Sequence, residues 1–312
     1  MSIATLLIIS TIVSLIALAG YLVARSSRKK RQKARIRNSY WSIGYQTSNS
    51  PFDISPETAA VYGRGQLAPD VHGVADPFLL ERDGTIYLFY ELIVNTSPAA
   101  KIAVSTYDQD NQAWIFHSVI LDEPFHLSYP FVFEHGSEVY MIPETKKAGA
   151  VRLYRATDFP SKWEFEKNLI EDKKFVDSSI FCWQGNYYLF TSRKRKLYLY
   201  YSKSPTGDWK LHPRSPVKRW NYARCAGKIF EDDGRLFRFA QEQAKGYGMG
   251  LRRFEILELS TKDYKEVAVD KGLFFKPCGD SWAQHGMHHL DILKFADNTY
   301  LSVFDGRGVE NT

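Results

Sequence analysis

The stretch HGVADPFLLERDGTIYLFYE, residues 72–91, decides the fold of this chain. Two apolar runs flank the turn sequence Arg82-Asp83-Gly84, and apolar and polar residues alternate within each run. Period-two alternation on both sides of a glycine-containing turn predicts a β-hairpin. The hairpin leaves Asp76 unexplained, because this acid stands where the first strand begins. Asp before Pro is typical of a turn, but an acid at a strand end is also typical of an active site.

The hairpin pattern recurs four more times along the chain. The later copies are SYPFVFEHGSEVYMIPE, VDSSIFCWQGNYYLFTS, CAGKIFEDDGRLFRFAQ and the less regular MHHLDILKFADNTYLSVFDGR. Their turn glycines Gly84, Gly136, Gly185 and Gly234 are 52, 49 and 49 residues apart, and Asn298 follows 64 residues later. A further pair of strand-like runs follows the hairpins. Four strands repeated about every 50 residues predict the blades of a β-propeller.

The fifth blade runs out of sequence after its second strand, near Val303. An open ring would leave unpaired strand edges. The stretch SYWSIGYQTS, residues 39–48, has the pattern of a strand, and we expect it to complete the last blade and close the ring. A β-sandwich is the rival fold, but it would not need such regular four-strand units. The predicted fold class is an all-β, five-bladed β-propeller preceded by one N-terminal transmembrane helix.

Composition agrees with a strand-rich body that has a large core. Of the 312 residues, 44% are hydrophobic and 15% are aromatic, and aromatic side chains favour strands. The three cysteines, Cys182, Cys225 and Cys278, are an odd number without CxxC spacing. They predict neither a disulfide framework nor a zinc site, as is typical of a reducing compartment.

The first forty residues predict a membrane anchor. IATLLIISTIVSLIALAGYLVA, residues 3–24, contains no charge and is long enough to span a bilayer as a helix. Nothing basic precedes it, unlike a signal peptide, and RSSRKKRQKARIR follows it at once. The positive-inside rule then places the C-terminal side in the cytoplasm. We therefore expect a transmembrane helix over residues 1–24, a basic juxtamembrane linker over 25–38 and a propeller over 39–312, in a single-pass membrane protein with the propeller on the cytoplasmic side.

The formal net charge of +6 belongs to the N-terminal segment. Eight of the 41 Lys and Arg residues lie in the first forty residues, which contain no Asp or Glu. The remaining body carries 33 basic and 35 acidic residues, so its net charge is near zero. A body of this kind does not predict nucleic-acid binding, and the basic run beside an apolar span is better suited to anionic lipid head groups.

Candidate site residues stand at the ends of the inner hairpin strands, where the repeat carries polar residues in place of core residues. Two carboxylates, Asp76 and Asp177, would face each other across the central channel of the propeller and could work as an acid/base pair. Glu144 is the third catalytic candidate. We expect Tyr129 or Trp220 to stack on a sugar. The substrate-binding candidates are His72, Glu91, Tyr129, Arg224, Glu242, His288, His289 and Arg307.

Each candidate has a structural alternative. Asp76 could be a turn residue, and Glu144 could be a solvated loop acid. His285, His288 and His289 suggest a metal, but no second ligand set stands at a defined spacing, so we predict no metal and no cofactor. The stretch KGYGMG, residues 245–250, resembles a phosphate-binding loop. It precedes a strand instead of opening a helix, which favours a blade loop.

The motifs VADPFLLERDGTIYLFYE, LSYPFVFEHGSEVYMIPET, VDSSIFCWQGNYYLFTS, AGKIFEDDGRLFRFAQ and GMHHLDIL resemble the N-terminal domain of glucosamine inositolphosphorylceramide transferases and their bacterial relatives, over roughly residues 40–310. More distantly, the Asp-Pro of the first inner strand resembles five-bladed glycoside hydrolases such as family 43. In that clan, acids on the inner strands of blades one, three and four serve as base, modulator and general acid.

The resemblance to the hydrolases transfers only in part. It implies that Asp76 is the base and Asp177 the modulator. The fourth inner strand, NYARCAGKIF, has no Glu for the general acid. Either Glu144 or Glu242 takes that role, or the hydrolase mechanism is absent. In the plant transferases, the resemblance implies that sugar transfer belongs to a separate C-terminal glycosyltransferase domain, which would lie outside this sequence.

Three functions stay open at this point. The first is a membrane-anchored, carbohydrate-active propeller that binds or processes a sugar, glycolipid or nucleotide sugar in a glycosyl-transfer pathway. The second is a noncatalytic sugar-binding or scaffold module that partners a glycosyltransferase, which the missing fourth-blade acid favours. The third is a glycoside hydrolase, which would be secreted only if the N-terminal segment were cleaved. A raised pKa of one of the carboxylates at the ends of the inner strands would favour an enzyme.

Overall fold

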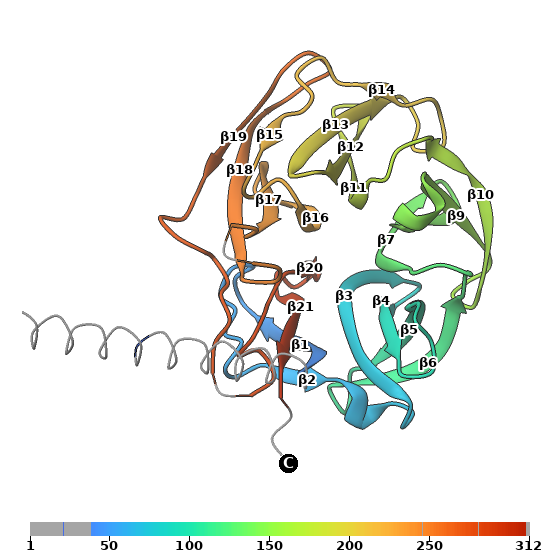
Figure 1. Cartoon of the computed structure of the whole chain (residues 1–312), viewed down its shortest axis with the longest axis vertical. Helices are drawn as coiled ribbons and strands as arrows, with labels where there is room; N and C mark the ends of the chain where they lie inside the picture. The colour runs from blue at the N-terminus through green and yellow to red at the C-terminus, as the bar shows by residue number, and fades with distance from the viewer. Residues whose placement is uncertain (1–20, 22–38, 245, 280, 310–312) are drawn as a thin grey trace, which may run out of the picture. The chain divides into compact units, whose positions relative to one another are not determined.

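The computed structural model describes residues 21, 39–244, 246–279 and 281–309, which include five antiparallel sheets. The sheets form a ring, and in each of them one strand lies near the ring centre and the others follow outward (Figure 1). This arrangement confirms the predicted all-β, five-bladed propeller and excludes a β-sandwich.

The first two blades follow the chain in simple order. Blade 1 contains β3 (Val71–Arg82), β4 (Thr85–Val94), β5 (Lys101–Asp108) and β6 (Ala113–Leu121). Blade 2 contains β7 (Ser128–His135), β8 (Glu138–Glu144), β9 (Val151–Asp158) and β10 (Lys162–Ile170). Two short 3₁₀ turns lie at Arg64–Gln66 and Lys146–Ala148.

The next two blades keep the same order, with one addition. Blade 3 contains β11 (Val176–Trp183), β12 (Asn186–Arg193), β13 (Lys196–Ser202) and β14 (Lys210–Leu211), and β15 (Lys218–Arg219) also pairs with β13. Blade 4 contains β16 (Cys225–Asp232), β17 (Arg235–Gln241), β18 (Leu251–Leu259) and β19 (Tyr264–Ala268). Blade 3 therefore has five strands where the repeat predicted four.

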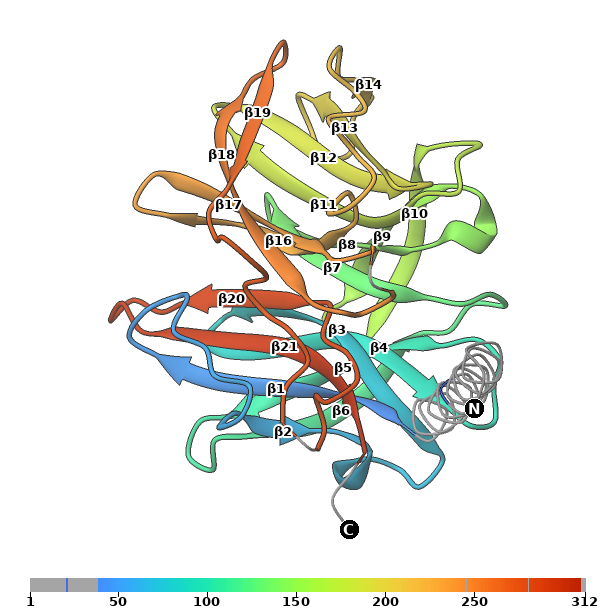
Figure 2. The ribbon, with the colours of Figure 1, turned by 60° about the vertical axis from the view of Figure 1, so that its left-hand side comes forward.

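The fifth blade closes the ring with strands from both ends of the propeller. It orders β20 (Leu290–Lys294), β21 (Tyr300–Gly308), β1 (Tyr40–Ser48) and β2 (Ala60–Tyr62), so red and blue strands lie side by side in Figure 2. The pairing of β1 with β21 is antiparallel and runs from Tyr40 opposite Gly308 to Ser48 opposite Tyr300. The prediction that residues 39–48 complete the last blade is confirmed.

Tight turns explain why the hairpins form where the sequence places them. In blades 1, 3 and 4 the two residues between the first and second strands both have positive φ, and the second is glycine. Two left-handed residues in a two-residue loop are the signature of a type I′ turn, whose twist matches that of the strands. The three turns are Asp83-Gly84, Gln184-Gly185 and Asp233-Gly234.

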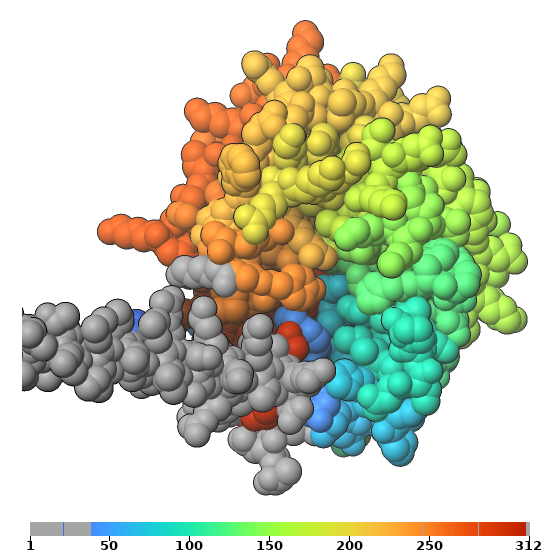
Figure 3. All heavy atoms as spheres, in the orientation of Figure 1, coloured from blue at the N-terminus to red at the C-terminus, as the bar shows by residue number. Residues whose placement is uncertain are grey.

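The core lies between the blades. Its largest cluster of buried side chains spans blades 1 to 4 and includes Phe89, Met141 and Leu189, all fully buried. Burying one such side chain contributes about 1.5–3 kcal/mol to folding. In the space-filling view, side chains of neighbouring sheets largely fill the gap that the ribbons leave at the ring centre (Figure 3).

A buried ion cluster joins blades 3 and 4 away from the ring centre. Arg238 on β17 is 1% exposed, and its Nε and Nη2 donate to the two carboxylate oxygens of Glu266 on β19 at 2.8 and 2.9 Å. Glu266 also accepts from Lys218 Nζ at 2.6 Å and from the Tyr264 hydroxyl at 2.7 Å. The two cations and two hydrogen bonds lower the pKa of Glu266 to about 2, although its burial would by itself raise that pKa.

The predicted membrane anchor lies outside this description. Of residues 1–38, which hold the predicted transmembrane helix and basic linker, the structure describes only Tyr21. Among the residues that are described, there is no helix of the length and apolarity that a bilayer crossing requires. The transmembrane helix therefore stays a prediction.

Candidate functional site

The inner strands of blades 1 to 4 share a β-bulge at one end, and the bulge sets the direction of the candidate side chains. Register shifts interrupt β3 after Ala75, β7 after Ser128, β11 after Val176 and β16 after Cys225. In the bulges, Asp76, Tyr129, Asp177 and Gly227 have positive φ of 52°, 48°, 48° and 129°. Bulges with left-handed residues re-aim side chains and often lie beside functional sites. The repeat thus predicted three of these four positions, and in blade 4 the left-handed residue is Gly227.

Asp76 links three blades. Its backbone N–H donates to Asp305 Oδ2 of blade 5 at 3.2 Å, and its own Oδ2 accepts the backbone N–H of Tyr129 of blade 2 at 3.2 Å. The side chain is almost completely buried. Burial raises the pKa of Asp76 to about 7, although the charge of His288 lowers it. The negative charges of Asp177 and Asp305 also raise this pKa.

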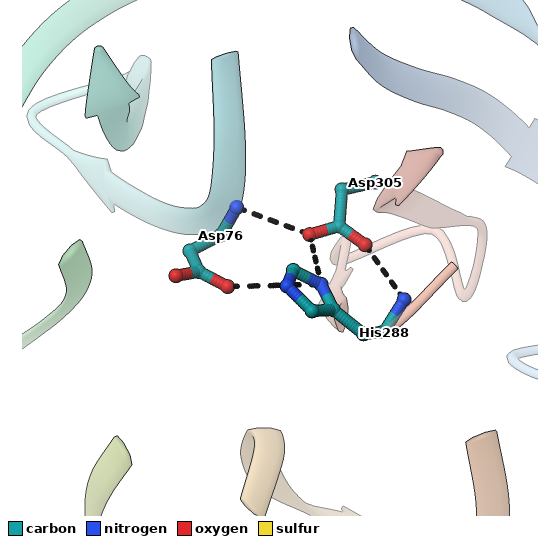
Figure 4. A group of neighbouring side chains, drawn as sticks. All are labelled: Asp76, His288 and Asp305. Carbon is teal, nitrogen blue, oxygen red and sulfur yellow. Dashed lines mark hydrogen bonds and ion pairs between the residues drawn. The ribbon is translucent and has the colours of Figure 1, made fainter. Parts of the chain in front are cut away.

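His288 lies between the carboxylates of Asp76 and Asp305 (Figure 4). Its Nδ1 is 2.5 Å from Asp305 Oδ2 and 3.9 Å from Asp76 Oδ1, and its Nε2 is 2.6 Å from the Tyr247 hydroxyl. Burial alone would lower the pKa of His288, but the charge of Asp305 and its hydrogen bond outweigh burial, so the pKa is raised. Burial alone would raise the pKa of Asp305, but the charge and hydrogen bond of His288 lower it. His288 and Asp305 therefore form an ion pair.

Two glutamates complete an acid cluster with Asp76. Glu91 is 8% exposed, and Glu144, at the end of β8, is also largely buried. Burial first, and then repulsion from neighbouring carboxylates, raises the pKa of Glu91 well above its usual value. Burial and the charge of Asp177 raise the pKa of Glu144 to about 8, even though Arg224 Nη2 lies 3.5 Å from Glu144 Oε2. We call Asp76, Glu91 and Glu144 the acid cluster.

Asp177, in contrast, is fully engaged with other side chains. Arg224 Nε and Nη2 donate to its two oxygens, and Gln241 Nε2 donates to Oδ2 at 2.9 Å. A bidentate guanidinium pair fixes the relative orientation of the two side chains. Asp177 thereby positions Arg224 beside Glu144.

Tyr129 and His289 belong to the core of the ring. The Tyr129 ring is fully buried against Phe78 and His289, and its hydroxyl accepts the Gly227 N–H at 2.8 Å. Burial lowers the pKa of His289 to about 3, so its ring is neutral. The Tyr129 ring has no exposed face on which a sugar could stack.

The remaining predicted residues lie apart from the acid cluster or serve other contacts. Trp220 is 74% exposed and lies outside the acid cluster. His72 Nδ1 is 3.1 Å from Asn95 Oδ1. Glu242 accepts from the Tyr222 hydroxyl at 2.8 Å and the Ala244 N–H at 2.6 Å, and the Arg307 guanidinium lies 6.0 Å from the Trp41 ring centre. Of the two possible replacements for the missing acid, Glu144 is the one in the cluster.

Three residues offer an arrangement that a metal ion could use. Asp76, His288 and Asp305 each have one ligand atom within 4.8 Å of the others, which makes them the single such group within the described ranges. Two carboxylates and an imidazole suit a divalent cation. In this structure the imidazole already contacts one of the two carboxylates, because His288 Nδ1 lies 2.5 Å from Asp305 Oδ2.

Comparison with known proteins agrees with this fold. Residues 35–307 match the model of the family described as glucosamine inositolphosphorylceramide transferase 1, N-terminal. The chain belongs to this family. The resemblance inferred from the motifs is confirmed.

Curated members of the family are longer than this chain. Glucosamine inositolphosphorylceramide transferase 1 of Oryza sativa subsp. japonica is 33% identical over 296 residues, which are 85% of this chain and 40% of the relative. The protein of the same name from Arabidopsis thaliana is also 33% identical, with 39% of its length covered. The chain thus spans about two fifths of the length of these relatives.

Two solved structures with a similar fold are glycoside hydrolases. The catalytic domain of a Coprinopsis cinerea GH62 α-L-arabinofuranosidase has a TM-score of 0.57 at 13% identity, covering 85% of this chain and 97% of that one. Zg3597, a family 117 glycoside hydrolase of Zobellia galactanivorans, has a TM-score of 0.55 at 10% identity, covering 86% and 91%. At these identities the likeness concerns the fold alone.

The sequence reasoning missed two aromatic residues beside the acid cluster. Trp41 on β1 stacks on His288 at 4.3 Å between ring centroids, and Tyr247 lies edge-on to both rings. Tyr247 is 57% exposed, so this family member presents an aromatic surface directly beside its acid cluster. Tyr247 belongs to the KGYGMG stretch, and the described part of that stretch, residues 246–250, lies in the loop between β17 and β18, as predicted. The aromatic residue of this stretch, and not its glycines, was the sequence feature that could have indicated a residue of the site.

Proposed function

We propose that this propeller recognises a sugar at the acid cluster and acts in a glycosyl-transfer pathway that builds glycolipids. The observation that carries the proposal is the grouping of three largely buried carboxylates, Asp76, Glu91 and Glu144, next to the exposed ring of Tyr247. Carboxylates accept hydrogen bonds from sugar hydroxyls, and an aromatic face covers the apolar face of a sugar ring. The names of the plant relatives support a glycolipid pathway.

A catalytic role is the second candidate, and the pKa values favour it over a noncatalytic scaffold. Glu144, with a pKa of about 8, holds a proton at neutral pH and could donate it to a leaving oxygen. Asp76, with a pKa of about 7, would accept a proton from the attacking hydroxyl or water. Asp177 would act as a positioning residue through Arg224. This pair could serve either transfer to an acceptor or hydrolysis.

Calorimetric titration with nucleotide sugars and simple glycosides tests sugar recognition. We expect the wild-type chain to bind at least one of these sugars, and Asp76→Asn to weaken that binding at least tenfold. Glu258→Gln is the control, because Glu258 is exposed on β18 of blade 4 and is not a member of the acid cluster. Loss of binding in the control, or no binding by the wild type to any probe, would contradict the proposal.

A product assay with the same probes separates catalysis from binding. If the pair is catalytic, Glu144→Gln should bind sugar but release or transfer it at least a hundredfold more slowly. If wild type and Glu144→Gln bind equally and neither forms product, the noncatalytic module is the correct function.

The membrane anchor and the orientation form a separate part of the proposal. Residues 3–24 would hold the propeller at the cytoplasmic face, where the basic run of residues 25–38 would contact anionic lipids. A topology reporter fused after Thr312 tests this part. A signal from the far side of the membrane would contradict the cytoplasmic placement and favour a secreted hydrolase.

A further inference from the structure

A strongly basic cavity lies beside the acid cluster. Its volume is about 390 Å³, within the range of small-molecule sites. Six of its nine lining residues are cations: Lys146, Lys174, Arg193, Lys194, Arg195 and Arg224. The other three are Val176, Ser192 and Gln243, so no carboxylate of the described chain lines it. We call these six cations and the cavity that they line the basic pocket.

Most of these charges are not neutralised by the protein. Arg224 pairs with Asp177 and Glu144, but Lys146, Lys174, Arg193 and Lys194 make no ion pair with any residue that the structure describes. The propeller as a whole is near neutral, so the excess of positive charge is local. Like charges around one cavity repel each other, and an anion in the cavity would remove that repulsion.

The hairpin turn that carries two of the cations is conformationally unfavourable. Arg193 pairs with Lys196, which leaves Lys194 and Arg195 as a two-residue loop with φ of 48° and 56°. This is again the type I′ signature, but the other three such turns have glycine at the second position. Here two residues with a Cβ occupy the left-handed region, which costs folding free energy. The chain therefore keeps cations at a turn where Asn-Gly would fold more easily.

Arg224 connects the basic pocket to the acid cluster. Arg224 lines the pocket, and its guanidinium Nη2 lies 3.5 Å from Glu144 Oε2. Ser192 and Val176, which line the pocket, pair with each other directly beside Asp177. A ligand with a sugar at the acid cluster would therefore place a group attached to that sugar next to the cations.

We propose that the basic pocket binds the phosphate of a phosphorylated sugar ligand, so that the substrate class is a sugar joined to a phosphate ester. The pyrophosphate of a nucleotide sugar and the phosphodiester of a glycolipid head group share this chemistry. The assignment rests on the proposed function for the position of the sugar, but among the described residues Arg224 is the one cation of the pocket that pairs with the acid cluster. Lysine and arginine donors around a cavity are the groups that proteins use for phosphate.

The test replaces the unfavourable turn by a favourable one. The double variant Lys194→Asn with Arg195→Gly removes two cations and introduces the preferred residues of a type I′ turn, so it should fold at least as stably as the wild type. Its thermal denaturation is measured first. The control double variant Lys265→Glu with Lys271→Glu changes the net charge more strongly at exposed positions outside the pocket.

Binding is measured by calorimetry with inorganic pyrophosphate, UDP, UDP-N-acetylglucosamine and glycerophosphoinositol. We expect the wild type to bind at least one phosphate probe, the turn variant to bind it at least tenfold more weakly and the control to bind it within twofold of wild type. Affinity should fall as salt is raised. Preference for UDP over glycerophosphoinositol identifies a nucleotide sugar as the source of the phosphate, and the reverse preference identifies a lipid head group.

Two outcomes overturn the pocket assignment. One is wild-type affinity of the turn variant for every phosphate probe, and the other is the absence of phosphate binding by the wild type. Asp76→Asn separates the two proposals. It should weaken the binding of UDP-N-acetylglucosamine relative to that of UDP, and it should leave the binding of pyrophosphate unchanged. If simple glycosides bind and phosphates do not, the pocket assignment is wrong and sugar recognition stands. If phosphates bind and Asp76→Asn has no effect on any sugar, only the sugar site is wrong.

Discussion

The carboxylate of Asp76 accepts the backbone N–H of Tyr129, which lies 53 residues further along the chain and in the next blade. The same residue donates its own N–H to Asp305 in the blade that closes the ring. Asp76 is therefore both a link between three blades and a member of the acid cluster. Substitutions at this position have to separate the two roles.

We expect Asp76→Asn to keep the fold and to lose sugar binding. The Asn side-chain oxygen can still accept the Tyr129 N–H, and Asn tolerates a left-handed φ, but the carboxylate chemistry is gone. Asp76→Ala should lower the free energy of unfolding by about 1–3 kcal/mol, because the buried Tyr129 N–H loses its acceptor. Chemical denaturation of both variants checks this difference. Equal stability of the Ala variant and the wild type would show that the inter-blade bond contributes little.

Glu144→Gln should change how stability depends on pH. The folded-state pKa of about 8 lies above the ordinary value of 4.5, so the folded protein holds this proton more tightly than the unfolded chain does. The resulting stabilisation is complete below about pH 4.5 and is lost as the pH rises through about 8. We expect the wild type to lose of order 3–5 kcal/mol over this window through Glu144, and the Gln variant to lack that component.

Denaturation of Glu144→Gln and wild type at a series of pH values measures the component directly. Glu258→Gln serves again as the control, since its exposed carboxylate should leave the wild-type profile unchanged. Parallel profiles for wild type and Glu144→Gln would show that the pKa of Glu144 is not raised.

Glu266→Gln should destabilise the propeller by about 3–5 kcal/mol. The change leaves the buried Arg238 and the nearby Lys218 without their anion. Because the folded pKa of Glu266, about 2, lies below the ordinary 4.5, its stabilisation is present above about pH 4.5 and is lost as the pH falls through about 2. Denaturant midpoints at pH 7 and pH 3 check both statements. A smaller loss is expected for the double variant Arg238→Met with Glu266→Leu, and a larger one would refute this explanation.

Gly227→Ala should unfold or severely destabilise the ring, by more than about 3 kcal/mol. A Cβ at residue 227 would lie 1.8 Å from the Leu290 carbonyl oxygen, and φ there is 129°. The matched control is Gly272→Ala, which meets no atom within 4 Å and does not have a positive φ. Soluble yield and melting temperature compare the two. Similar melting temperatures would mean that blades 4 and 5 can separate locally to accept the methyl group.

Truncation tests the ring closure. A chain of residues 39–312 keeps β1 and should fold, whereas a chain of residues 49–312 loses β1 and leaves β21 and β2 without their partner. We expect the shorter chain to aggregate, because an exposed strand edge pairs with other chains. Size-exclusion chromatography distinguishes a monomer from aggregates. A monomeric, cooperatively unfolding 49–312 chain would contradict the role of β1.

Local pattern was sufficient to predict the architecture. Alternation and turn chemistry are properties of neighbouring residues, so the hairpins, their repeat and the closing strand around Tyr40 could be recognised without any tertiary information. The repeat also placed Asp76 and Asp177 at equivalent strand ends, because both follow from the position of a residue within its own hairpin. The sequence alone therefore determined a five-bladed ring with acids at one end of its inner strands.

Only the tertiary structure decided what those acids contact. Asp177 is held by Arg224 from the segment that precedes blade 4, Tyr129 is fully buried in the core, and Trp41 contacts His288 from the opposite end of the chain. Such contacts depend on bulges and loops that bring residues together across blades, and burial then sets each pKa. No local pattern contains that information, because the same acid can be charged or neutral according to the neighbours that the closed ring places around it.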